Sequence, residues 1–147
     1  MKISNQNERV KINPKSIIKN TPLFEGKHLI LELYGCNYEK LNDEPYLRYQ
    51  LNSAAKQANA LVLNIISNKF EPYGVTAIAL LAESHMSIHT WPESKYAAID
   101  IFTCGINMKP NLASQFLIET LEASKHILKI ITREHPEFIE NQVREIR

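Results

Sequence analysis

The chain has 147 residues, the usual length of one domain, which leaves no room for two ordinary cores. A hydrophobic fraction of 44%, a charged fraction of 22% and a formal net charge of +1 are typical of a soluble globular protein, and they give no reason to expect a nucleic acid or an acidic surface as partner. Its two cysteines, Cys36 and Cys104, with no signal peptide before them, predict reduced thiols in a cytoplasmic protein and argue against a structural disulfide.

Residues 1–25 are predicted to form a basic extension, and residues 26–147 a single domain. The first 20 residues hold five Lys or Arg against one Glu, but no apolar run long enough for a signal peptide or a membrane helix. A basic arm can bind an anionic partner, although solvated charge is the commoner reason for such a stretch. We therefore expect a flexible or loosely docked arm and no membrane partner.

The first half of the domain is predicted as strand, helix, strand. Alternation predicts a strand over residues 28–33, and the polar residues 37–44 that follow are typical of a turn. Residues 60–66 form a second strand that is apolar on both faces and is therefore expected at the centre of the sheet. Between the two strands, Asp43 and Pro45 are helix-start signals for an amphipathic helix of about three turns. Its apolar stripe comprises Leu47, Leu51, Ala54, Ala55 and Ala58.

Cys36 lies just before the predicted turn, and no base is predicted beside it. A free cysteine without such a neighbour behaves as a small apolar residue. We expect Cys36 to be a partly buried packing residue.

The second half is predicted as three strands, a helix and a last strand. Residues 85–91 and 96–104 alternate with the period of a strand on either side of Pro92, which predicts a hairpin through residues 92–95. The other predicted elements are a strand over 75–82, a helix that opens at 107–110 and continues to about 124, and a strand over 127–132.

This order predicts an α+β fold in which two helices cover one face of an antiparallel sheet. A chain with only two helices has nothing left to cover the other face. An apolar sheet face of that size is not tolerated by a monomer, so another molecule is expected to cover it.

The stretch from 83 to 105 holds two histidines, three carboxylates, a cysteine and Ser84. His85, His89 and Cys104 can be considered as metal ligands. However, residues four apart on a strand stand about 13 Å from each other, too far to share one ion, so we predict no metal site. A Ser-His-acid hydrolase is also disfavoured, because the glycines of a nucleophile elbow are absent around Ser84.

This stretch resembles a known family. E-S-H-x-S-I-H-T-W-P-E at 83–93, followed by A-A-x-D-x-F-T-C-G at 97–105, is similar to the small prokaryotic type of S-adenosylmethionine decarboxylase, a self-processing pyruvoyl enzyme of spermidine synthesis. The resemblance is ungapped and extends upstream into F-E-P-Y-G-V-T at 70–76.

The resemblance implies that the chain cuts itself between Glu83 and Ser84 into residues 1–83 and 84–147. The Ser84 hydroxyl would attack the carbonyl carbon of Glu83, giving an ester that β-elimination breaks. Ser84 would then become a pyruvoyl group, the implied cofactor. This ketone forms a Schiff base with the substrate amine and accepts the electrons left when carbon dioxide departs.

Three further residues match positions with family roles. His89 matches a histidine that assists self-cleavage, and an imidazole exchanges protons near neutral pH as that role requires. Cys104 matches the cysteine that protonates the substrate carbon after decarboxylation. Thr76 stands where the family often has a serine, and it keeps a hydroxyl able to aid the acyl shift. Since an unbroken strand would place Ser84 and His89 on opposite faces, we expect a bend or bulge between them.

The same resemblance implies a binding site for S-adenosylmethionine. Phe70 and Trp91 are the aromatic candidates to stack on the adenine or to face the sulfonium cation. Glu93 matches a family carboxylate that holds the ribose hydroxyls. Simpler roles stay open: core packing for Phe70, filling of a dimer seam for Trp91, and a turn position for Glu93.

A homodimer of processed protomers, with active sites made from both and the two sheets forming a larger sandwich, is also implied. Two other functions stay open. One is a pyruvoyl decarboxylase of another amino acid, such as ornithine or arginine, because the same machinery would serve any amino acid that reaches the ketone. The other is a catalytically silent partner subunit, although the full set of catalytic candidates argues against it.

Overall fold

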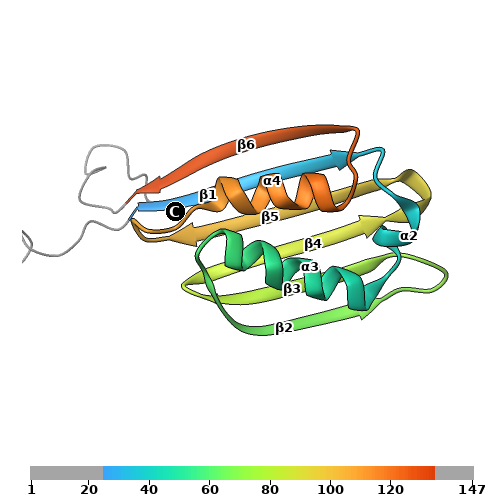
Figure 1. Ribbon diagram of the computed structural model, residues 1–147, viewed down its shortest axis with the longest axis horizontal. Coiled ribbons are helices and arrows are strands. Elements are labelled where there is room, and N and C mark those ends of the chain that lie inside the picture. The colour runs from blue at the N-terminus through green and yellow to red at the C-terminus, as the bar shows by residue number, and fades with distance from the viewer. Residues whose placement is uncertain (1–24, 135–147) are drawn as a thin grey trace, which may run out of the picture.

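The computed structural model describes residues 25–134; the predicted basic arm, apart from Glu25, and the residues after 134 lie outside this part. Figure 1 shows a single twisted sheet with two longer helices lying across it. The elements are β1 (Glu25–Tyr34), α2 (Tyr38–Leu41), α3 (Glu44–Gln57), β2 (Leu61–Lys69), β3 (Val75–Ala82), β4 (Ser84–Trp91), β5 (Tyr96–Cys104), α4 (Pro110–Thr120) and β6 (Lys125–Glu134).

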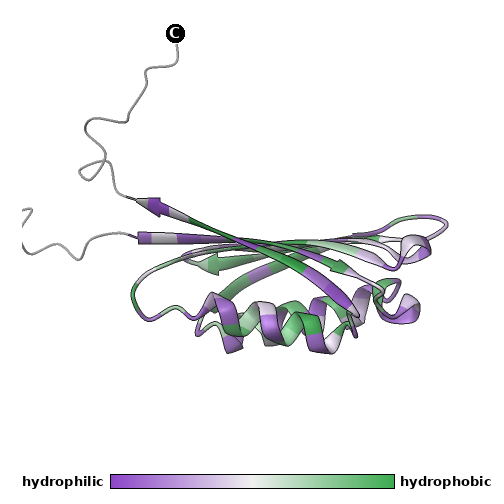
Figure 2. Ribbon diagram, turned by 90° about the horizontal axis from the view of Figure 1, so that it is seen from above, coloured by the Kyte–Doolittle hydropathy of each residue, from purple (hydrophilic) through white to green (hydrophobic). Residues whose placement is uncertain are grey.

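The six strands form one sheet in the order β2-β3-β4-β5-β1-β6, and every neighbouring pair is antiparallel. Helix α3 packs over β2, β3 and β4, and α4 packs over β1 and β5. Seen from above in Figure 2, both helices lie on the same side of the sheet. The predicted α+β fold with two helices on one face is therefore confirmed.

The predicted central place of the second strand is wrong, because β2 is an edge strand. Val62 and Ile65 pack against the core, whereas Leu61, Leu63 and Ile66 are exposed. A strand sequence that is apolar on both faces indicates that both faces are shielded from water. It does not show whether the same chain or another molecule shields them. Here the described residues 25–134 cover only one.

The predicted turn at residues 37–44 contains a short helix, α2. Asn37 caps it, because its side chain accepts a hydrogen bond from the Lys40 backbone N–H at 3.1 Å. The next helix, α3, starts where the sequence predicts, with the Asp43 side chain accepting from the Tyr46 N–H at 2.9 Å. It has 14 residues, about four turns instead of three. Short polar helices such as α2 carry too little periodicity to be told from turns.

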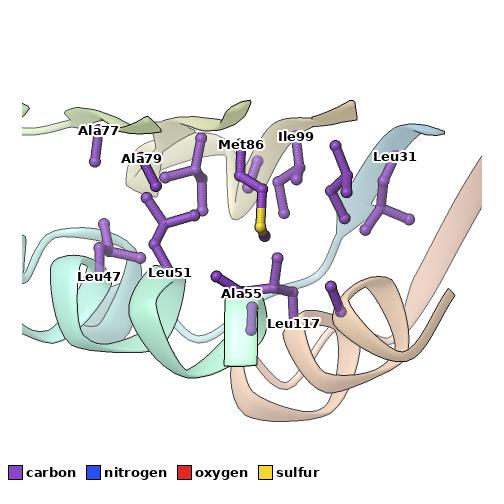
Figure 3. Close-up of a cluster of buried hydrophobic side chains, with 14 of the residues drawn as sticks. Leu31, Leu47, Leu51, Ala55, Ala77, Ala79, Met86, Ile99 and Leu117 are labelled. Atoms are coloured by element: carbon purple, nitrogen blue, oxygen red, sulfur yellow. The ribbon is translucent and has the colours of Figure 1, made fainter. Parts of the chain in front are cut away.

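The core lies between the helices and the sheet. Met86 and Ile99 on the strands meet Leu51 and Leu117 on the helices, and all four side chains are buried (Figure 3). Burying such a side chain contributes about 1.5–3 kcal/mol relative to its exposure, so this layer holds the helices on the sheet. Cys36 is buried here too, and desolvation raises the pKa of its thiol to about 11. It stays neutral, as expected of a packing residue.

The other face, which we call the open face, is covered by no helix among residues 25–134 (Figure 2). Its side chains are mixed. An apolar part lies on β2 and β3, where Ile66 stands opposite Ile78 and Leu80 is 53% exposed. Polar and aromatic side chains occupy β4, β5 and β1. No helix within the described residues is both long and apolar enough to pass through a membrane.

Candidate active site

Ser84 lies at the start of β4, directly after the tight turn at the exposed Glu83 that connects β3 to β4. Its φ of +119° is rare for a residue with a side chain, and conformations of this kind cost about 1–3 kcal/mol. Its Oγ lies 3.1 Å from the Sγ of Cys104, the last residue of β5. The predicted cleavage site therefore lies in a strained turn, with a hydroxyl and a thiol in contact beside it.

Thr76 and His89 form a second centre. They stand directly opposite each other on β3 and β4, on the open face, and Thr76 Oγ1 is hydrogen-bonded to His89 Nδ1 at 2.9 Å. This bond fixes the ring orientation and leaves Nε2 as the nitrogen free to meet a reacting group. The pairing brings together two residues that were each predicted to aid processing.

The bend expected between Ser84 and His89 is not present. The ladder between β3 and β4 runs without a register shift from the pair Leu81–Ser84 to the pair Thr76–His89. At a rise of about 3.3 Å per residue, five strand positions separate the two residues by about 16 Å. Within one chain, His89 does not reach Ser84. The residues between them alternate so that Met86 and Ile88 fill the core, and this packing keeps the strand regular.

A cavity of about 390 Å³ joins five of the predicted site residues: Phe70, Thr76, His89, Trp91 and Glu93. It lies at the end of β4 away from Ser84. The substrate-binding candidates thus adjoin the Thr76–His89 centre and not the Ser84–Cys104 centre of the same chain.

Sequence reasoning missed Tyr73, which also lines this cavity. Its signal was already present, because Tyr73 falls between Phe70 and Thr76 in the upstream segment of the family resemblance. As a partly exposed aromatic residue in a loop beside the cavity, it offers a third ring to a flat ligand.

Polar pairs continue across the open face on β1 and β5. His28 Nε2 lies 2.9 Å from Asp100 Oδ1, and the Tyr96 hydroxyl donates a hydrogen bond to Glu32. Burial, followed by the neighbouring Glu32 carboxylate, raises the pKa of Tyr96 to about 12. The Tyr96 ring also packs on Trp91, with centroids 5.1 Å apart, and so helps to hold that side of the cavity.

His85, considered above as a metal ligand, instead packs its ring against Phe102 at a centroid distance of 5.8 Å. Among residues 25–134, no three His, Cys, Asp or Glu side chains are grouped so that they could hold a metal ion.

The chain is similar to proteins of known family. A sequence model of the family described as S-adenosylmethionine decarboxylase matches residues 27–134, which include every predicted site residue. The S-adenosylmethionine decarboxylase proenzyme of Prochlorococcus marinus strain MIT 9313 is 55% identical over 119 residues, covering 81% of this chain and 95% of that one. The proenzyme of the same name from Synechococcus sp. strain WH7803 is 56% identical over 111 residues, covering 76% and 87%.

A solved structure is similar as well. The crystal structure of the adenosylmethionine decarboxylase from Aquifex aeolicus VF5 superposes with a TM-score of 0.71 at 32% identity. The superposition covers 82% of this chain and 97% of that one, so the likeness is not confined to a local motif.

Proposed function

The chain belongs to the S-adenosylmethionine decarboxylase family, and on this premise we propose that it is a self-processing carboxy-lyase. It converts S-adenosylmethionine into carbon dioxide and decarboxylated S-adenosylmethionine, the aminopropyl donor of spermidine synthesis. The observation that carries the proposal is the strained Ser84, whose Oγ lies 3.1 Å from Cys104 Sγ at the turn after Glu83.

The first reaction is self-cleavage. Ser84 Oγ attacks the carbonyl carbon of Glu83, so that an ester C–O bond replaces the peptide C–N bond and the hydroxyl proton ends on the freed amine. A base removes the Cα proton of Ser84, and the Cβ–Oγ bond breaks, so that the main-chain carboxylate of Glu83 departs as the new C-terminus. The resulting dehydroalanine becomes an imine, to which water adds as ammonia leaves. Cleavage also removes the constraint that holds Ser84 at positive φ, which favours the reaction.

The residues present fit the cofactor that this reaction makes. The pyruvoyl group supplies a ketone that binds the substrate amine and withdraws electrons from the carbon that loses carbon dioxide. Cys104 is the proton donor in this proposal. The position of Cys104 supports this role, because its thiol already contacts the side chain of Ser84 before cleavage.

We further propose a homodimer in which the Thr76–His89 centre of one subunit meets the Ser84–Cys104 centre of the other. The separation of about 16 Å between His89 and Ser84 along a regular strand leaves no way to join them within one chain. A twofold axis would form two equivalent sites, because the Thr76–His89 centre of each subunit would then lie against the Ser84–Cys104 centre of the other. The open face, with its exposed apolar residues on β2 and β3, is the surface that such a partner would cover.

In the dimer, the cavity brings the substrate to the partner's Ser84. Phe70 and Trp91 stack on the adenine or face the sulfonium, Tyr73 adds a third ring, and Glu93 holds the ribose hydroxyls. An aromatic wall with one carboxylate suits a cationic nucleoside better than ornithine or arginine, which carry no ring to stack.

Action between subunits can be tested with two inactive variants. Ser84→Ala lacks the attacking oxygen but keeps His89; His89→Ala keeps Ser84 but lacks the assisting imidazole. Expressed alone, Ser84→Ala should stay uncut and His89→Ala should be cut slowly. When the two are co-expressed with different tags, the His89→Ala chain in mixed dimers should be cut at close to the wild-type rate, as judged by intact mass.

The control is a mixed dimer of Ser84→Ala with a chain carrying both Ser84→Ala and His89→Ala, in which no chain should be cut. Unchanged slow cleavage of the His89→Ala chain in verified mixed dimers would show that His89 acts within its own chain, or not at all. Carbon dioxide release from labelled S-adenosylmethionine, ornithine and arginine then compares the substrates.

Two free thiols, Cys36 and Cys104, support the cytoplasm as the proposed location.

A further inference from the structure

The loop of residues 70–74 between β2 and β3, which we call the aromatic loop, carries Phe70 and Tyr73 to the cavity. Its two ends are tied together, because the Phe70 N–H donates to the Gly74 carbonyl oxygen at 2.8 Å. Phe70 is 49% exposed, and no residue from 70 to 73 is buried. Core packing therefore contributes little to the position of the loop.

Asn42, the C-cap residue of α2, forms hydrogen bonds beside both ends of this loop. Its Oδ1 accepts a hydrogen bond from the Gly74 N–H at 3.0 Å, and its carbonyl oxygen accepts one from Lys69 Nζ at 2.9 Å. Asn42 itself does not line the cavity of Phe70 and Trp91. It thus contacts both flanks of the aromatic loop without touching the ligand space.

Thr90 provides a second tie to the same region. Its buried hydroxyl accepts from the Val75 N–H at 2.9 Å and donates to the Leu41 carbonyl oxygen at 2.7 Å. Leu41, the last residue of α2, and Asn42, its C-cap, are therefore linked through these bonds to the consecutive backbone amides of Val75 and Gly74, where the loop ends and β3 begins.

Gly74 makes this arrangement selective for one loop conformation. Its φ of +104° is one that side chains rarely adopt, and a Cβ on it would lie 3.0 Å from the Thr90 carbonyl oxygen. In this conformation the Gly74 N–H donates its hydrogen bond to Asn42 Oδ1.

We infer that Asn42 is a positioning residue for the nucleoside part of the substrate, because it holds the aromatic loop in its binding conformation before the ligand arrives. The inference rests on the proposed function. A loop that must be ordered on binding lowers affinity by the cost of ordering it, whereas a loop already held does not. Loss of one such hydrogen bond is expected to weaken nucleoside binding by about threefold to tenfold.

The test uses Trp91, the single tryptophan of the sequence, which lines the cavity and reports its occupancy by fluorescence. The self-cleaved, full-length protein is titrated with 5′-methylthioadenosine, which has the nucleoside but lacks the α-amino group that reacts with the ketone. Asn42→Ala should bind about threefold to tenfold more weakly than wild type. Asn42→Asp, which keeps an acceptor oxygen for Gly74, should bind within about twofold of wild type. Asn111→Ala, the same change at an exposed position of α4, should have no effect.

Steady-state kinetics add a readout that a general loss of stability would not give. For Asn42→Ala, KM for S-adenosylmethionine should rise by the same factor, while kcat stays within about twofold, because Asn42 lines no part of the cavity and carries no group proposed to act in the reaction. Equal affinity of wild type and Asn42→Ala would overturn the inference, as would equal losses for the Ala and Asp variants. Absence of any Trp91 response in the wild type would instead count against the proposed nucleoside cavity.

A measurement on the wild type covers the case in which Asn42→Ala fails to fold. Amide hydrogen exchange should show the Gly74 N–H protected in the free protein and protected further with 5′-methylthioadenosine bound. Exchange of the Gly74 amide at the rate of an unprotected loop would overturn the inference.

Discussion

The two faces of the sheet are built from the same strands but differ in what completes them. On β3, Leu81 faces the helices and is 3% exposed, whereas its neighbour Leu80 faces the other way and is 53% exposed. On β5, Ile99 and Ile101 are buried under the helices, while Asp100 and Cys104 are only half-buried on the open face.

The two faces of the sheet therefore have different roles, since one stabilises the fold and the other carries reactive side chains. The helix-covered face is finished within one chain, so its side chains are apolar and tightly packed. The open face carries Thr76, His89 and Cys104, and Ser84, the first residue of β4, contacts Cys104. In the proposed dimer, the partner completes each centre. Residues that must meet a substrate and a partner cannot also be sealed in a core.

The largest expected effect concerns Cys104 on the open face. Cys104→Ala should still cut itself, because the thiol acts only after the pyruvoyl group has formed. Its decarboxylation rate should fall by about 10²- to 10⁴-fold, the usual contribution of a positioned acid. The assay follows carbon dioxide release from S-adenosylmethionine together with the mass of the 84–147 chain. Near-normal turnover of fully cut protein would show that Cys104 is only a packed thiol.

Leu81 and Leu80 provide a matched pair across the two faces. Leu81→Ala removes a buried side chain and should lower the free energy of unfolding by about 2–5 kcal/mol. Leu80→Ala should change it by less than about 1 kcal/mol but weaken self-association. Urea unfolding and sedimentation, both in a Ser84→Ala background so that every chain stays uncut, measure the two effects. Similar stability losses for both variants would contradict the contrast between the faces.

The smallest effect concerns Tyr96 at high pH. Because its pKa is raised to about 12 from the ordinary 10, the folded state keeps the proton that the unfolded state loses. This stabilisation is complete below pH 10 and decreases as the pH rises toward 12. Urea midpoints measured from pH 9 to 12 should fall more steeply for the wild type than for Tyr96→Phe. Parallel profiles would mean that Tyr96 does not titrate in this range.

Much of the fold followed from local pattern. Alternation correctly predicted the hairpin on either side of Pro92, and Asp43 and Pro45 correctly marked the start of α3. The prediction for β2 failed because an apolar run does not reveal its place in a sheet. The predicted bend before His89 failed for a related reason, since it assumed that two residues with a joint role must meet within one chain.

The sequence by itself determined the family and the facing of side chains along each strand, because a strand has a period of two and the residues around Ser84 match at fixed offsets. Only the tertiary structure decided which distant residues meet. Thr76 joins His89, Ser84 joins Cys104, and Asn42 reaches Gly74. Strand register and loop position depend on the packing of the whole chain, which no local pattern contains.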